Sequence, residues 1–217
     1  MNTKPLKLAV LLSGSGTTLQ NMVDRIAADD LQASVELVIG SRPGLKGIER
    51  AQSAGLPNVI IERKAFTDVA AFSHEVFRAI DAAQVDLVCL AGWLCLLEIP
   101  PQYLGRVMNI HPALLPSFAG RGMFGHHVHD AVLAHGCKIS GCTVHFLDNA
   151  YDTGPIIIQR TCPVVEGDTP DALAQRVFEQ EKLAYPAAIT LFAQDRLKIV
   201  GRRVEILPHP ALHTPIQ

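Results

Sequence analysis

The sequence predicts an α/β protein with a doubly wound, mostly parallel open sheet and helices on both faces. Short apolar runs alternate with longer runs of helical period through the first 91 residues. The apolar runs are nearly continuous, which is typical of parallel strands covered on both faces. With 217 residues, 48% of them hydrophobic, the chain can bury a substantial core. We interpret residues 1–207 as one domain and residues 208–217, with three prolines, as a loosely held tail.

The first half is predicted to contain four strands separated by three helices. The strands are short, rich in branched aliphatic residues and bounded by Gly, Pro or Ser: residues 6–12, 35–40, 58–61 and 86–91. The helices show a helical apolar period: residues 19–28, 45–54 and 69–83. This βαβα order predicts a doubly wound open sheet.

The second half changes character and suggests an antiparallel or mixed extension of the sheet. The predicted elements are a strand at 107–110, a Pro- and Gly-rich loop at 111–125, a helix at 128–135, strands at 143–147 and 155–165, a helix from Pro170 to about residue 184, a helical piece to 195, and a hairpin at 197–200 and 204–207. Thr169 is a suitable N-cap for the long helix, and Pro170 suits its first position. We expect Pro186 to end that helix.

Composition narrows the possible functions. The net charge of −2 disfavours a nucleic-acid partner. The five cysteines are odd in number and form no C-x-x-C pair, so free thiols in a reducing cytosol are favoured over disulfides or zinc. No apolar run has the length of a membrane span or a signal-peptide core.

The segment Ser13-Gly-Ser-Gly-Thr-Thr18 follows the first predicted strand and precedes the first helix. Small residues there allow backbone N–H groups to approach an anion, and the helix start adds partial positive charge. No Gly-Lys-Ser/Thr follows, and Leu19 replaces the third Gly of a dinucleotide fingerprint. A phosphate on a small substrate is therefore favoured, with a plain tight turn as the alternative.

Three side chains suit transfer of a one-carbon acyl group between amines. Asn109 and His111 lie two residues apart, so strand alternation puts them on one face at a strand end. Asp152 follows about forty residues later in an Asp-Thr-Gly-Pro loop. An amide and an imidazolium can donate to an oxyanion, and a carboxylate can hold the imidazole charged. The alternatives are a capped turn and ordinary turn chemistry.

Other polar residues give weaker indications. Three histidines lie within four residues, at His126, His127 and His129, which could indicate a zinc site. No Cys or carboxylate lies at the spacing that zinc ligands need, so a solvated helix start is favoured. Glu181 has the local pattern of a solvated helix residue. Arg121, in a glycine-rich stretch, could add an anion contact.

Several segments together resemble the phosphoribosylglycinamide formyltransferase family over nearly the whole chain, from about residue 6 to 199. The motifs that carry this resemblance are SGSGTTLQ at 13–20, LAGW at 90–93, NIHPALLP at 109–116, GCTVHF at 141–146, DTGPII at 152–157 and GDT at 167–169. They occur in the family's order and at roughly its spacing.

The resemblance implies a formyl transfer from 10-formyltetrahydrofolate to glycinamide ribonucleotide, with Asn109, His111 and Asp152 catalytic. It implies that Gly16, Thr17 and Thr18 bind the phosphate and that Glu181 holds the ribose. It also implies a folate cleft made of the following residues: Leu94, Cys95, Leu96, Leu97, Asn109, Asp148, Asn149, Ala150, Tyr151 and Asp152. No metal is required, and the chain is expected to act as a monomer or homodimer in the cytoplasm.

Some positions depart from the family pattern, and several rival functions remain. Cys95 and Val69 stand where many members have arginines, which affects the binding of the folate tail. Formyltransferases acting on methionyl-tRNA or an amino sugar share the catalytic trio; the tRNA enzyme is expected to have a further C-terminal domain and a basic surface. A formyltetrahydrofolate hydrolase is expected to have an N-terminal regulatory domain. A non-enzymatic nucleotide- or folate-binding module is the rival from another class.

Overall fold

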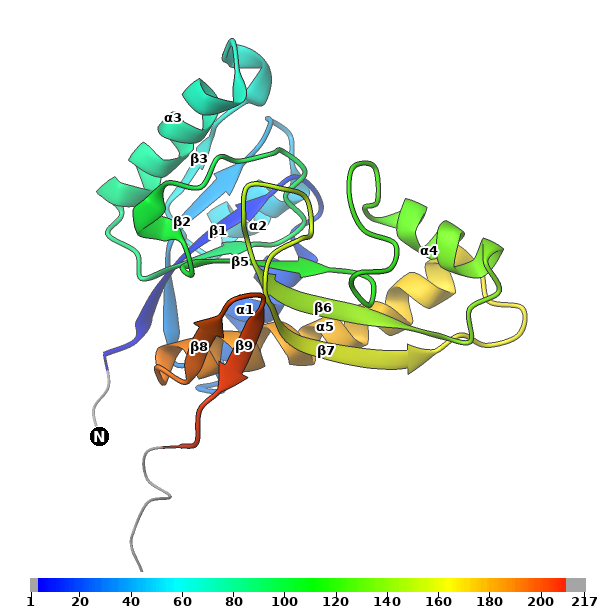
Figure 1. Cartoon of the computed structure of the whole chain (residues 1–217). Helices are drawn as coiled ribbons and strands as arrows, with labels where there is room; N and C mark the ends of the chain where they lie inside the picture. Colours follow the sequence, from blue (N-terminus) through cyan, green and yellow to red (C-terminus); the bar gives the residue numbers. More distant parts are fainter. Residues whose placement is uncertain (1–3, 210–217) are drawn as a thin grey trace, which may run out of the picture.

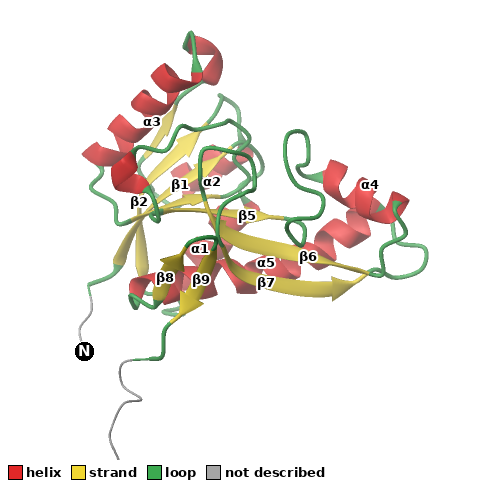
Figure 2. Ribbon diagram, viewed as in Figure 1, coloured by secondary structure: helices red, strands yellow, loops and turns green. Residues whose placement is uncertain are grey.

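The structure is a computed structural model and describes residues 4–209. Within these residues a nine-stranded sheet has the order β3-β2-β1-β4-β5-β6-β7-β9-β8, with helices on both faces (Figure 1 and Figure 2). The predicted fold class is therefore confirmed. Most of the tail predicted at 208–217 lies outside the described residues.

The first five strands are parallel: β1 (Leu6–Leu12), β2 (Ala33–Gly40), β3 (Asn58–Ile60), β4 (Leu87–Leu90) and β5 (Val107–His111). An antiparallel extension follows, made of β6 (Ile139–Phe146) and β7 (Ile156–Pro163). The hairpin β8 (Leu197–Val200) and β9 (Arg203–Ile206) completes the sheet, with β9 joined to β7 by one parallel pair. The mixed extension predicted for the second half is thus confirmed.

The helices divide between the two faces of the sheet. They are α1 (Thr17–Ala27), α2 (Lys46–Ser53), α3 (Val69–Ala82), α4 (His126–Ala134) and α5 (Pro170–Ala193), with short 3-10 turns at Arg63–Ala65 and Pro101–Tyr103. Helix α3 contributes Phe72 and Val76 to the core on one face. Leu19 of α1, Ile48 of α2 and Tyr185 of α5 belong to the core on the other. Burial on both faces explains why the central strands are apolar without alternation.

Strand β1 marks the switch point of the sheet, because its neighbours β2 and β4 are reached by connections that run in opposite directions. Loops that leave the carboxyl ends of neighbouring strands toward opposite faces create a crevice between them. The Ser13–Thr18 segment therefore begins in the place where open α/β sheets bind ligands.

The prediction that Pro186 ends the last helix is wrong. Helix α5 continues through Pro186 to Ala193. A proline lacks the N–H that would bond the carbonyl four residues earlier, here that of Lys182. The Asn21 side chain of α1 donates to this Lys182 carbonyl at 3.2 Å. Pro186 is itself buried, so packing and a substitute donor offset the lost helical hydrogen bond.

Strand β6 begins at Ile139, earlier than the predicted residue 143. Its early residues include Ser140 and Gly141, to which the sequence analysis assigned no element. A Cβ on Gly141 would lie 2.0 Å from the Arg160 carbonyl oxygen, so the glycine allows close approach of β7. The N-cap prediction for α5 is confirmed, since the Thr169 side chain accepts from the Ala172 amide.

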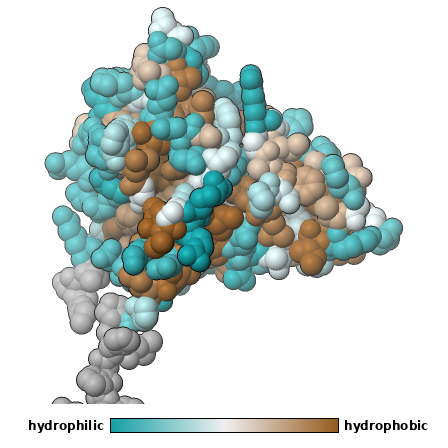
Figure 3. All heavy atoms as spheres, in the orientation of Figure 1, coloured by the Kyte–Doolittle hydropathy of each residue, from teal (hydrophilic) through white to brown (hydrophobic). Residues whose placement is uncertain are grey.

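No helix between residues 4 and 209 is long and apolar enough to cross a membrane. On the face shown in Figure 3, hydrophilic and hydrophobic residues are interspersed, with apolar side chains near the β8–β9 hairpin, where Ile199, Val200 and Ile206 are exposed.

Candidate active site

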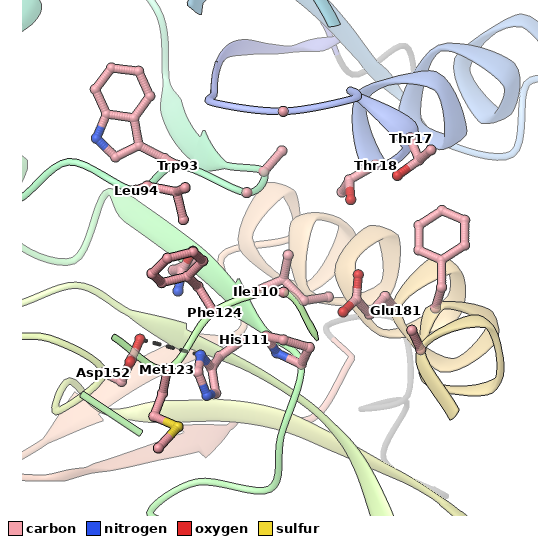
Figure 4. A pocket seen from close by; sticks show the side chains of 18 of the residues that line it. Thr17, Thr18, Trp93, Leu94, Ile110, His111, Met123, Phe124, Asp152 and Glu181 are labelled. Carbon is pink, nitrogen blue, oxygen red and sulfur yellow. Dashed lines mark ion pairs between the residues drawn. The ribbon is translucent and has the colours of Figure 1, made fainter. Parts of the chain in front are cut away.

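A cavity of about 670 Å³ runs along the carboxyl ends of β1, β4 and β5. Figure 4 shows Thr17, Thr18 and Glu181 at one end and His111 with Asp152 at the other. Its lining is drawn from five segments: residues 14–18, 91–94, 109–112, 120–125 with His129, and 151–152, together with Ala174, Phe178 and Glu181 of α5. The cavity thus joins residues from both halves of the chain.

The Gly14–Thr18 segment forms one end of the cavity; after the prediction from the sequence, we call this segment the anion loop and this end of the cavity the anion end. Gly16 precedes α1 with φ of 72° and provides no side-chain cap, so the first amides of the helix stay open. The loop is also tied to the opposite wall, because the Ser13 hydroxyl accepts from the Leu94 amide at 3.1 Å. This geometry suits a phosphate group.

Asn109 and His111 leave β5 on the same face, as strand alternation predicts. The antiparallel register places Asn109 directly opposite His145 of β6, and the Asn109 Nδ2 lies 3.2 Å from the His145 Nε2. His111 is 3% exposed, and its Nε2 lies 2.8 Å from the Phe118 carbonyl oxygen. That carbonyl can only accept, so it holds a proton on Nε2 and leaves Nδ1 as the nitrogen that faces the acid.

Asp152 reaches the site from the loop between β6 and β7. Its Oδ1 lies 3.6 Å from the His111 Nδ1, and its Oδ2 accepts from the Gly120 amide at 3.0 Å. Asp152 itself adopts φ of 56°, a conformation that Asp and Asn tolerate better than most residues. The structure therefore brings together the amide, the imidazole and the carboxylate that sequence reasoning singled out separately.

His145 is a residue of this cluster to which sequence analysis assigned no role. Its Nδ1 lies 2.9 Å from the Phe146 carbonyl oxygen, so the proton of the neutral ring belongs on Nδ1. Burial lowers the pKa of His145, which favours this neutral form. Its Nε2 then accepts a hydrogen bond from the Asn109 NH2 group, which fixes the orientation of that side-chain amide. The feature that identifies His145 is its antiparallel pairing with Asn109, and a single sequence does not show which residues pair across strands.

The predicted folate residues fall into two groups. Leu94, Tyr151, Asn109 and Asp152 line the cavity. Leu97 is only 2% exposed and belongs to the core around α3, and Cys95 and Leu96 are half-buried. Asp148 and Asn149 support the surrounding loops: the Asp148 carboxylate accepts from the Ala150 amide and the Thr153 hydroxyl, and Asn149 accepts from the Ile99 amide at 2.7 Å.

Three apolar side chains that line the cavity were not assigned to it from the sequence: Trp93, Met123 and Phe124.

Glu181 projects from α5 into the cavity, near Thr18 (Figure 4). Burial raises the pKa of this carboxyl to about 7. It is therefore not the solvated helix residue that its local pattern indicates. The reason is that α5 packs against β6 and β7 while this side chain faces the crevice.

The three histidines of α4 do not share one environment. His126 and His127 are exposed, and the His126 Nδ1 lies 3.4 Å from Asp171. His129 is buried at the cavity wall, and burial lowers its pKa to about 4. Among residues 4–209, no group of three or more His, Cys, Asp or Glu is placed to hold a metal ion.

Fold and site together define an open α/β protein whose ligand cavity, at the switch point of the sheet, carries an amide, an imidazole and a carboxylate. The formyl transferase family model matches residues 6–189, and the chain belongs to that family. The resemblance stated from the sequence motifs is thereby confirmed.

Relatives and solved structures agree with this membership. The phosphoribosylglycinamide formyltransferase of Escherichia coli (strain K12) is 35% identical over 89% of this chain and 90% of its own length. The trifunctional purine biosynthetic protein adenosine-3 of Drosophila melanogaster is 42% identical over 85% of this chain, which spans only 14% of that longer protein. Glycinamide ribonucleotide transformylase 1 from Symbiobacterium toebii superposes with a TM-score of 0.87 at 41% identity, over 94% of this chain and 95% of that one.

A formyltetrahydrofolate deformylase from Pseudomonas syringae pv. tomato also has this fold. It superposes with a TM-score of 0.82 over 94% of this chain and 66% of that chain, at 23% identity. At that identity the likeness concerns the fold alone.

Proposed function

We propose that this chain transfers the formyl group of 10-formyltetrahydrofolate to the amine of glycinamide ribonucleotide, a step of purine biosynthesis. The observation that carries this proposal is that one cavity has the anion loop at one end and the Asn109–His111–Asp152 cluster at the other. A phosphorylated amine could bind with its phosphate at the anion loop and its amine beside this cluster, where a formyl donor would meet it. The names of the two relatives that match this chain nearly end to end support formyl transfer and the same acceptor.

Each substrate has its own part of the cavity in this scheme. The phosphate of the ribonucleotide binds the amides and hydroxyls of Gly16, Thr17 and Thr18, and Glu181 accepts from the ribose hydroxyls. The folate head occupies the side walled by Leu94 and the loop at 148–152. Residues predicted to bind folate that are buried instead, such as Leu97, then support the Leu94 side of the cavity from within the core. Both partners are small molecules, and the proposed compartment is the cytoplasm.

The reaction begins when the acceptor amine attacks the formyl carbon and an oxyanion develops. His111, charged and faced by Asp152, donates through Nδ1, and Asn109 donates through the amide hydrogen that His145 does not use. Losing one such donor typically raises the barrier by about 3 to 4 kcal/mol. Collapse breaks the bond to the folate nitrogen. The attacking amine loses one proton and the folate nitrogen gains one, so His111 and Asp152 move protons without net change.

The test is an acceptor panel with a 10-formylfolate as donor, in which the deformylated folate is followed by absorbance. The acceptors are glycinamide ribonucleotide, the same compound without its phosphate, methionyl-tRNA, an amino-sugar nucleotide, and water alone. We expect fast turnover with glycinamide ribonucleotide and much slower turnover without the phosphate. Equal turnover in water would indicate a hydrolase, and preference for another acceptor would overturn the substrate assignment.

Asp152→Asn distinguishes the chain's own activity from that of a contaminant. Asn keeps the left-handed backbone at this position but removes the negative charge that faces His111. A matched control is Asp29→Asn, at an exposed position with the same φ of 56°. Activity should fall in the first variant and persist in the second.

A further inference from the structure

Three contacts fasten the anion loop to the first turns of α2. The Gly47 amide donates to the Gly14 carbonyl at 3.2 Å. The Arg50 Nε donates to the Ser15 carbonyl at 3.0 Å. Gly16 packs so closely that a Cβ there would lie 2.5 Å from the Gly47 Cα. The loop is thus held from behind by a helix that does not itself line the cavity.

These contacts determine where the loop's N–H groups point. In a trans peptide the carbonyl and the N–H of the same unit point in opposite directions. Because α2 holds the Gly14 and Ser15 carbonyls, the N–H groups of Ser15 and Gly16 are directed away from α2. Within residues 4–209 neither of these two amides donates to a protein acceptor, and both residues line the cavity. They are available to an anion.

We propose that Arg50 is a positioning residue for substrate phosphate: by holding the Ser15 carbonyl it aims the Gly16 amide into the cavity. This inference rests on the proposed function for the identity of the phosphorylated substrate. Arg50 does not line the cavity, so it acts through the loop and not by touching the ligand. Its guanidinium is oriented by a second hydrogen bond, from Nη1 to the Gln20 Oε1 at 3.2 Å.

A planar guanidinium can serve both acceptors at once, because its donors are fixed in a fork. A lysine at this position keeps the charge but not the paired geometry. Arg50→Lys therefore separates positioning from simple attraction between the positive charge and the phosphate. Arg50→Ala removes both. Arg78→Ala is the matched control, because it removes one positive charge from α3 on the other face of the sheet.

The experiment measures KM for each substrate and kcat for these three variants, with thermal unfolding to verify that they fold. We expect Arg50→Ala and Arg50→Lys each to raise KM for glycinamide ribonucleotide by about tenfold, the usual scale for loss of a charged hydrogen bond. KM for the formylfolate, and kcat at saturation, should change little. With the dephosphorylated acceptor the variants should match the wild type, as Arg78→Ala should with every substrate.

Binding of ribose 5-phosphate by calorimetry keeps this inference separate from the proposed function. If the wild type does not formylate glycinamide ribonucleotide but Arg50→Ala still weakens ribose 5-phosphate binding, the positioning role stands and the function fails. Wild-type KM in Arg50→Ala would overturn the positioning role. Wild-type KM in Arg50→Lys alone would assign the effect to charge and would also overturn it.

Discussion

The two ends of the cavity differ in the chemical groups that form them: main-chain amides at one end and side chains at the other. The anion end consists of main-chain amides at the start of α1, and α2 supports it from behind. The other end, which we propose is catalytic, consists of side chains from β5, β6 and the loop that follows β6, and carbonyls of Phe118 and Phe146 orient its imidazoles. An amide loop binds any group of the right charge and size, whereas side chains with fixed protons can stabilise one developing charge. The comparison teaches that affinity for substrate and catalysis should be separable by mutation.

The largest expected effect belongs to the catalytic end. His111→Ala removes the donor that faces the developing oxyanion, so kcat should fall by about 10²–10⁴-fold with little change in acceptor affinity. The measurement is steady-state turnover with both substrates varied. His74→Ala provides the control, because that exposed imidazole lies on α3 and does not line the cavity. A His111→Ala enzyme with the wild-type kcat would remove the catalytic assignment.

The next effect should appear at the anion end. Gly16→Ala introduces a Cβ at 2.5 Å from the Gly47 Cα, at a residue whose φ is 72°. Displacement of the loop should raise acceptor KM and lower stability by about 1–3 kcal/mol. Gly55→Ala has a similar φ of 68° but open space, so it isolates the cost of backbone strain. Equal acceptor KM in the two variants would show that the contact with α2 does not matter.

A smaller effect is expected from His145, which contacts Asn109, one of the two proposed donors to the oxyanion. His145→Leu removes the acceptor that orients the Asn109 amide, and kcat should fall by about tenfold, the equivalent of one hydrogen bond. His145→Gln retains an acceptor oxygen and should recover part of the loss. Both KM values should stay near the wild type. If Leu and Gln behave alike, orientation of Asn109 is not the role of His145.

The smallest effect is a change in pH profile. The pKa of Glu181 is raised to about 7 by burial, so its carboxylate fraction grows as pH rises through that value. The carboxylate accepts hydroxyl hydrogen bonds better than the protonated acid, so kcat/KM for the ribonucleotide should rise across this range. Glu181→Gln should flatten the rise, measured from pH 5.5 to 8.5 (about 1.5 units on either side of the carboxyl's pKa). A profile identical to the wild type would exclude Glu181 as its source.

Local sequence patterns were sufficient for most elements, for the anion loop and for two candidate site residues. Strand β1 and the anion loop can be predicted from the sequence because a buried strand, small residues and a helix start follow one another directly in the chain. Asn109 and His111 are visible because strand alternation alone places them on one face. The formyl transferase motifs then link these pieces to Asp152 and Glu181.

What the sequence by itself determined is therefore what depends on neighbours within one or two turns: the alternation of strands and helices, the N-cap at Thr169, and the candidate side chains. Only the tertiary structure decided the rest. The Asn21 side chain that lets α5 pass Pro186, the pairing of His145 with Asn109, and the carbonyl of Phe118 that sets the His111 proton all join distant segments or depend on a loop's path. Such contacts depend on register and packing between elements, and a hydrogen bond has no fixed sequence separation from which it could be read.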